Sequence, residues 1–256
     1  MLTAYLTQTR RLLQLPAAPV TLYADVDLTA YINTARAQLA GDGECIRAYG
    51  TLSTVVGTNN YSFGSLAFTG ASAATGIAGA INVRSLAYAV ASGQQWITPR
   101  PWEWFNFYVL NDPVGNQPAN YGPPSTWAQY AQGGVPQAGT SQVQGGSFYI
   151  NRPDDAYTLL ADCACYPIPL VDDTTKEAIP FMWTDAVQFF AAYYALMSSQ
   201  MQARMSDAIR YFEMYKTFLG RARDAATPAV LRTQYEQVPD PVQAQKLGIK
   251  QQGGQG

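Results

Sequence analysis

The feature that most constrains this fold is a nearly continuous apolar helix in the C-terminal third of the chain. Residues 183–199 (WTDAVQFFAAYYALMSS) have helical spacing but are apolar on almost every side, and Thr184 or Asp185 can cap the helix. A helix without a polar face must be covered all round, so we expect it at the centre of a group of helices. Its longest apolar stretch, residues 189–197, is too short to cross a bilayer.

Two N-terminal segments can cover this central helix. Residues 2–15 form a short apolar helix that Pro16 stops. Residues 28–40 form an amphipathic helix, with Asp27 as its N-cap and the glycines at 41 and 43 as its end. The first 14 residues carry polar side chains throughout and lack the apolar core of a secretory signal.

A fourth helix is predicted over residues 202–225. Its polar face has charges at steps of three, which favours weak surface ion pairing. Its expected buried stripe is Met205, Ala208, Ile209, Phe212, Tyr215 and Leu219, and its charged positions are Asp207, Arg210, Glu213 and Lys216. Together the four segments predict an antiparallel helical bundle.

The middle of the chain has strand-like rather than helical patterns. Alternating and β-branched runs predict a strand at 45–56 and a strand followed by a turn over 80–93. They also predict a β-hairpin at 147–166 with its turn at 152–155. A short helix is expected over 102–109 after two prolines. Loops are expected over residues 61–79, which are small and rich in glycine, and over residues 111–146, which are rich in Gly, Pro, Gln, Asn and Ser.

These segments predict an α+β protein with three parts. Residues 1–44 and 180–226 form the antiparallel helical bundle, and residues 45–179 form a β-rich insertion with a long Gly/Gln/Pro loop. Residues 227–256 form an extended C-terminal tail, since three prolines, four glycines and no firm period exclude a core of their own.

The absence of histidine excludes several functions. With no histidine in 256 residues, Ser-His-Asp and Cys-His catalytic sites, histidine metal ligands and a histidine pH switch are ruled out. The three cysteines, Cys45, Cys163 and Cys165, contain no CxxC pair, and we interpret them as small buried hydrophobic residues. The chain therefore predicts no cofactor and no metal.

Acidic pairs offer little for catalysis. Asp42 and Glu44 follow a helix end, and Asp154 and Asp155 lie in the expected hairpin turn. Asp172 and Asp173, with Glu177 nearby, could hold a divalent cation, but their spacing matches no EF-hand and favours a solvated linker. The Gly-rich runs contain no phosphate-binding motif.

Charge is sparse and unevenly distributed. Only 13% of residues are charged, about half the usual share, which suggests that much of the surface meets other protein. Residues 101–200 hold two basic and nine acidic residues, an excess of seven negative charges. Without a clustered basic face, sequence-specific DNA binding is not expected. An acidic middle would suit a channel through which DNA slides, although a solvated acidic loop explains it more simply.

Two groups of apolar residues are candidates for contacts with other proteins. The aromatic segment 96–110 and the loop after it supply Trp102, Trp104 and Trp127, for contacts between subunits or with another protein. Base or sugar stacking is disfavoured there because only Arg100 is close. The tail supplies the spaced anchors Tyr235, Val238, Val242, Leu247 and Ile249 for docking onto a partner.

Several motifs of the chain resemble head-to-tail adaptor (neck or connector) proteins of short-tailed double-stranded DNA bacteriophages. They are DLTAYINTARAQLAGDGECIR (27–47), NVRSLAYAVASGQQWITPRPWEWFNFY (82–108), DCACYPIPLVDDTTKEAIPFMWTDAVQFFAAYYALMSSQ (162–200) and RMSDAIRYFEMYKTFLGRARDAATP (204–228), followed by the proline-rich tail. None is a catalytic signature. The resemblance implies a structural virion protein, not an enzyme.

The resemblance also implies partners. About twelve copies would form a ring under the portal protein, each tail would reach the portal, and the far side would receive a tail nozzle or tail fibre protein. DNA would pass through the ring without sequence-specific binding. Two alternatives remain open: a tail-completion or nozzle protein, and a virion-associated cell-wall hydrolase working through Glu44 or Glu103.

Overall fold

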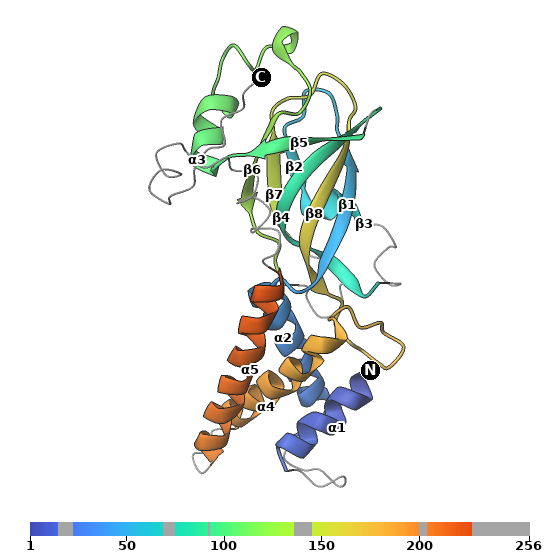
Figure 1. Cartoon of the computed structure of the whole chain (residues 1–256), viewed down its shortest axis with the longest axis vertical. Helices are drawn as coiled ribbons and strands as arrows, with labels where there is room; N and C mark the ends of the chain where they lie inside the picture. Colours follow the sequence, from blue (N-terminus) through green and yellow to red (C-terminus); the bar gives the residue numbers. More distant parts are fainter. Residues whose placement is uncertain (15–22, 69–74, 92, 136–144, 200–203, 227–256) are drawn as a thin grey trace, which may run out of the picture.

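The computed structural model describes residues 1–14, 23–68, 75–91, 93–135, 145–199 and 204–226. Over these residues the chain is a mixed α+β protein with a group of helices at one end and a curled eight-stranded sheet at the other (Figure 1). The α+β class is confirmed, and the sheet-bearing part is the larger one. The antiparallel bundle and the three-part division stay predictions, and the tail from 227 onward lies outside the described residues.

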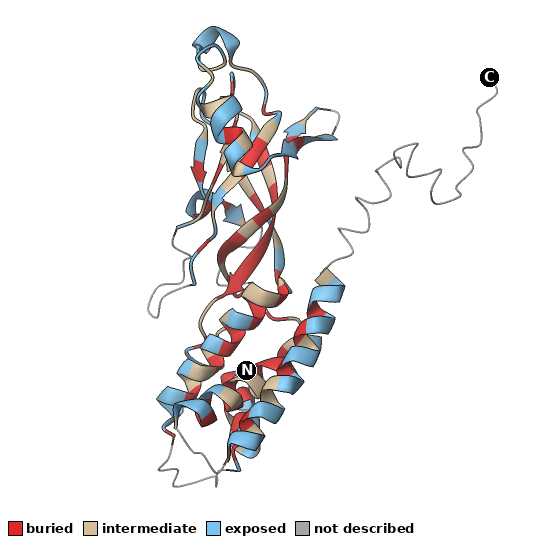
Figure 2. Ribbon diagram, turned by 90° about the vertical axis from the view of Figure 1, so that its left-hand side faces the viewer, coloured by how far each residue is buried: buried red, intermediate tan, exposed pale blue. Residues whose placement is uncertain are grey.

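Four helices gather at the end away from the sheet (Figure 1). They are α1 (Leu2–Leu12), α2 (Asp25–Gly43), α4 (Thr184–Ser198) and α5 (Met205–Ala226). Their shared core consists of Leu13, Tyr23, Leu28, Ala192, Ala195, Leu196 and Ala208. Helix α4 is buried along much of its length, but it is not covered on every side as predicted, because Tyr194 and Met197 are 43% and 41% exposed. The burial colours of Figure 2 show the helices turning their buried sides toward one another.

The predicted caps of two helices are wrong. Helix α2 begins at Asp25 with Ala24 as its N-cap, so Asp27 lies inside the first turn. There its carboxylate interacts favourably with the positive end of the helix dipole. The helix continues through Gly41, and Glu44, at φ 46°, ends it. Helix α4 follows Trp183 without a side-chain cap, because the Thr184 hydroxyl donates to the carbonyl of Phe181 instead (2.8 Å).

The buried stripe of α5 is also corrected. Ala208, Tyr215 and Leu219 are buried as predicted, but Met205 and Ile209 are 41% and 57% exposed. Ala222 joins the buried side because the stripe turns toward the C-terminal end of α2. The predicted surface ion pairing is confirmed for Glu213 and Lys216 (3.0 Å), whereas Asp207 pairs with Arg204.

The sheet has the order β2-β7-β6-β5-β4-β8-β1-β3. Its strands are β1 (Arg47–Ser53), β2 (Asn60–Ser62), β3 (Ala67–Phe68), β4 (Ile77–Val90), β5 (Gly93–Pro99), β6 (Thr126–Ala131), β7 (Ser147–Ile150) and β8 (Thr158–Pro167). Its two outermost strands, β2 and β3, are consecutive in sequence, and the short η1 helix (Phe63–Ser65) links them. The sheet therefore curls until its two edges are bridged by one short connection.

The predicted hairpin at 147–166 is wrong. Its two strands exist as β7 and β8, but β7 pairs with β2 and β6, whereas β8 pairs with β1 and β4. Three strands separate β7 from β8 in the sheet. The long strand β4 offers β8 a longer ladder than four-residue β7 could, so a distant partner replaces the sequence neighbour.

Segments expected to be loops also contribute strands. Residues 61–79 supply most of β2, all of β3 and the start of β4, and residues 111–146 supply β6. Strand β5 was not predicted either. The expected short helix is confirmed as α3 (Trp102–Phe105), which continues as one π-helical turn over Asn106–Leu110.

Candidate functional site

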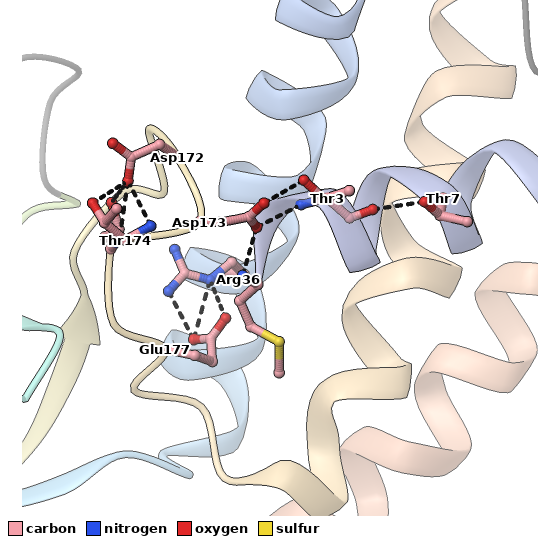
Figure 3. A network of polar contacts seen from close by, with 9 residues as sticks. Thr3, Thr7, Arg36, Asp172, Asp173, Thr174 and Glu177 are labelled. Carbon is pink, nitrogen blue, oxygen red and sulfur yellow. Dashed lines mark hydrogen bonds and ion pairs between the residues drawn. The ribbon is translucent and has the colours of Figure 1, made fainter.

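The connection between the sheet and the helices is held by a buried ion pair. Residues 168–180, here called the junction loop, run from β8 to α4. Arg36 of α2 donates from Nη2 to Oε1 of Glu177 (2.7 Å) and from Nε to its Oε2 (3.0 Å). Its Nη1 donates to the carbonyl of Ile168 (2.7 Å). Figure 3 shows the two side chains facing each other, so one guanidinium joins both ends of the junction loop to α2.

Two further contacts fix the middle of the junction loop. Oδ1 of Asn33 accepts a hydrogen bond from the backbone N–H of Leu170 (2.8 Å), and its Nδ2 donates to the Leu170 carbonyl (3.0 Å). Gly76, which precedes β4, has φ +72°, and a Cβ placed there would lie 2.3 Å from the carbonyl oxygen of Lys176. Only glycine fits this approach of the loop to the sheet.

Asp173 fastens the junction loop to the start of α1. It accepts from the Met1 ammonium (2.6 Å), from the backbone N–H of Thr3 (2.9 Å) and from the Thr3 hydroxyl (Figure 3). The ammonium and the two Thr3 donors hold the pKa of Asp173 well below its usual range. Asp172 accepts instead from Thr174 and Thr175, which lowers its pKa as well.

The prediction of a solvated linker at 172–180 is therefore wrong for Glu177, which is buried against Arg36. The three acids point to three different sets of donors and do not converge. Within the described ranges, no group of three or more carboxylate or cysteine side chains is arranged to hold a metal ion.

A second junction lies where α2 ends. Glu44 accepts from Nδ2 of Asn82 (2.7 Å) and from Nη1 of Arg84 (2.8 Å), both on β4. Nε of Arg223, near the end of α5, donates to the carbonyl of Asp42 (2.7 Å). The ends of α2 and α5 are thereby fixed against β4. Glu44 thus has structural partners, and Glu103 lies on α3, at the end of the sheet away from the helices (Figure 1).

The predicted contact tryptophans lie in two environments. Trp102 is half-buried between Tyr130 and Tyr149, with ring centroids 4.6 and 4.9 Å away. Trp104 is also half-buried and carries the guanidinium of Arg100 4.8 Å from its ring centroid. Trp127 is 4% exposed and belongs to the main hydrophobic core of its own chain.

More exposed aromatic residues adjoin them. Phe107 and Tyr108 on the π-helical turn are 68% and 58% exposed, and Trp96 on β5 is 63% exposed. No sequence pattern signals the exposure of Phe107, because a regular helix would have placed it differently from the π-helical turn. Arg100, Trp104, Phe107 and Tyr108 form a connected ridge, which we call the aromatic ridge.

The cysteines have the predicted surroundings. Cys163 and Cys165 are buried, Cys45 is half-buried, and all three are free thiols. Burial raises the pKa of Cys45 and of Cys165 to about 12, and it also raises the pKa of Cys163. Such thiols remain protonated at neutral pH and are poor nucleophiles.

Comparison with known protein families gives a match to the SU10 adaptor protein family over residues 3–236. The matched residues include the helices as well as all strands of the sheet. The chain belongs to this family. No curated protein matches the chain.

Membership identifies a bacteriophage head-to-tail adaptor, as the sequence motifs indicated. The family consists of structural adaptor proteins rather than a known class of enzyme, and it implies a component of the virion that interacts with other virion proteins. In the part of this adaptor that the structure describes, no helix is long and apolar enough to span a membrane.

Proposed function

We propose that this adaptor forms a ring, about twelve copies in number, between the portal protein and the tail. The observation that carries the proposal is the family match over residues 3–236. Double-stranded DNA would pass through the ring during packaging and ejection without sequence-specific contacts. Assembly would take place in the host cytoplasm.

The outer surfaces of the helices support a ring. Large apolar side chains are exposed on α4 and α5: Tyr194 (43%), Met197 (41%), Met205 (41%), Ile209 (57%) and Met214 (37%). Contiguous exposed apolar patches mark contact sites between proteins, and we propose that these side chains contribute to such contacts. In a closed ring each copy uses two different faces for its two neighbours, and the antiparallel bundle predicted from the sequence would supply them.

The end of α5, from which the tail continues, and the aromatic ridge lie in different parts of the molecule, which suits two different partners. Helix α5 ends beside the sheet, and the tail that follows carries the proposed portal-docking residues Tyr235, Val238, Val242, Leu247 and Ile249, all outside the described residues. The aromatic ridge lies near α3, at the far end of the sheet from the helices (Figure 1). We assign Trp102, Trp104 and the aromatic ridge to contacts with a tail nozzle or tail fibre protein, and Trp127 to support beneath them.

The main alternative is a tail-completion or nozzle protein, for which the tail would not be needed to bind the portal. A cell-wall hydrolase is the least supported alternative, because Glu44 is bound by Asn82 and Arg84 and lies far from Glu103. A Glu44→Gln or Glu103→Gln variant that assembled normally but lost lytic activity would favour the hydrolase.

The decisive variant removes residues 228–256. Portal rings from the same genome are sedimented with the full chain or with the shortened chain, and bound protein is quantified. The adaptor proposal predicts that only the full chain sediments with the portal. A Trp104→Ala variant is the matched control, since it should bind the portal normally but lose the nozzle or fibre protein. Portal binding by the shortened chain would favour the completion or nozzle role.

A further inference from the structure

A cavity of about 540 Å³ opens between α2 and the sheet. One wall is the outward side of α2, including Ala30, Thr34, Ala37 and Gly41. The other wall comprises the end of β8, residues of β4, and the segment after β6: Tyr166, Pro167, Pro169, Ile81, Asn82, Gln132 and Val135. We call this cavity the α2 groove. Its lining combines apolar residues with polar and charged ones, which include Arg36, Asp42 and Glu44. Its size suits a few side chains of an extended peptide.

Asn82, one of the residues that line the groove, has an unused hydrogen-bond acceptor. Nδ2 of Asn82 donates to Glu44, but Oδ1 of Asn82 is buried and has no partner among the described residues. A buried acceptor without a donor is costly, and native proteins rarely leave one unpaired. A backbone N–H of a peptide lying in the groove would satisfy it.

The described part of α5 ends beside this groove. Ala226, the last residue of α5, lines two smaller cavities of about 450 and 300 Å³, and both share Glu44 with the α2 groove. The smaller also shares Gly41 and Asp42 with it. Because Arg223 holds the end of α5 on the Asp42 carbonyl, the following residues start at one end of the groove.

The sequence after Ala226 suits the groove. Pro228 prevents α5 from continuing and favours extended backbone before it. Val230 and Leu231 follow as adjacent apolar residues, and Arg232 brings a positive charge toward the rim that holds Asp42. The family match continues through these positions to residue 236. Eight extended residues reach at most about 26–29 Å, which limits them to nearby surface.

We propose that residues 227–234 of the same chain occupy the α2 groove in extended form. Val230 or Leu231 contacts the apolar wall, and a backbone N–H of the segment donates to Oδ1 of Asn82. The role of this contact rests on the proposed function, although the contact itself can be tested without it. The groove holds the base of the tail, so that Tyr235 and the later anchors leave the body of the adaptor in a fixed direction toward the portal.

The test measures backbone hydrogen exchange in the free, full-length chain without any portal present. The expected result is that amides of 229–234 exchange about tenfold or more slower than in a synthetic peptide of the same sequence. Ala37→Trp, which fills the groove, should return them to the peptide rate. Val26→Trp, on an exposed position of α2 outside the groove lining, is the matched control and should leave the protection intact.

A second variant leaves the body of the protein unaltered. Val230→Asp with Leu231→Asp changes only the tail, and it should release 229–234 while the amides of α4 and β8 keep their protection. Exchange of 229–234 at the peptide rate in the unaltered chain would overturn the proposal, as would protection that survives both groove filling and the tail variant.

Two other outcomes would assign the groove to a different occupant and so also overturn the proposal. Protection that rises with protein concentration would assign it to the tail of a second copy. Protection that needs portal rings would assign it to the portal complex. Because no portal enters the main measurement, failure here leaves the ring proposal standing, and failure of portal binding leaves this one standing.

Discussion

Arg36 and Glu177 lie 2.7 Å apart, Nη2 to Oε1, with side chains only 1% and 8% exposed. One residue belongs to a helix near the N-terminus and the other to the loop that enters α4. Charges this deeply buried are tolerated only when they are paired and their remaining donors are satisfied. Arg36 meets that condition through the Ile168 carbonyl and Oδ1 of Asn33. The pair therefore helps to fix the position of the sheet relative to the helices.

Removing either partner should be strongly destabilising. We expect Glu177→Gln or Arg36→Met to lower the free energy of unfolding by about 3–5 kcal/mol, because a buried charge loses its counterion. The double variant Arg36→Met/Glu177→Leu should recover most of that loss. Denaturant unfolding of the three variants measures this.

The matched control for the buried pair is Glu213→Gln, which breaks the exposed pair with Lys216 (side chains 61% and 51% exposed). Its effect should not exceed about 0.5 kcal/mol. A double variant no more stable than the single ones would show that the residues act separately.

Gly76 should not tolerate a side chain. Its φ is +72° and an added Cβ meets the Lys176 carbonyl, so Gly76→Ala should cost about 1–3 kcal/mol. Gly220→Ala in α5 is the comparison, because a Cβ added there has nothing within 4 Å and alanine favours a helix interior. That variant should gain about 0.5–1 kcal/mol. Equal melting temperatures for the two variants would contradict the close approach of the junction loop to Gly76.

The junction loop should make stability fall in acid. The pKa of Asp173 is lowered in the folded state by the Met1 ammonium and by Thr3. A lowered folded pKa stabilises the protein above the unfolded value of about 3.9, and this contribution disappears as the pH falls through the folded pKa. Asp173→Asn should therefore weaken the pH dependence of unfolding below about pH 4. Asp224→Asn, at the end of α5, is the comparison and should leave that pH dependence unchanged. The same loss of stability in acid for both variants would argue against the contact between Asp173 and α1.

The three thiols should react slowly in the native protein. With Cys45 and Cys165 at pKa values of about 12 and the pKa of Cys163 raised as well, little thiolate is present near neutral pH. A thiol reagent should label the native chain slowly and all three cysteines at once after unfolding. Fast labelling of Cys163 in the native state would show that β8 opens locally.

Local patterns predicted the helices well because each carries its own period. Helices α1, α2, α4 and α5 fall close to their expected ranges, with errors confined to caps and to one end of the α5 stripe. Strand partners follow from contacts distant in sequence, which is why the expected pairing of residues 147–166 failed. Strands β2 and β3 lie in a segment rich in glycine and small residues, and β6 lies in one rich in glycine, proline and amides. Composition alone predicts loops in both.

The junction was missed for a related reason. The helical pattern over 28–40 assigns no role to Arg36, although Arg36 shares the apolar side of α2 with Ile32 and Leu39. A charge within an apolar stripe is a detectable signal for a buried ion pair, but the sequence alone does not name Glu177 as its partner. The exposed positions of Phe107 and Tyr108 depend on a π-helical turn that regular helical spacing does not indicate.

The most direct test of the proposed role is electron microscopy of this adaptor mixed with portal rings from the same genome. The account predicts a second ring, built from about twelve copies, capping one end of the portal. Its helices should face the portal and its aromatic ridges should point away. Portal rings that remain bare at saturating adaptor concentration, or that bind through the aromatic ridge, would contradict it.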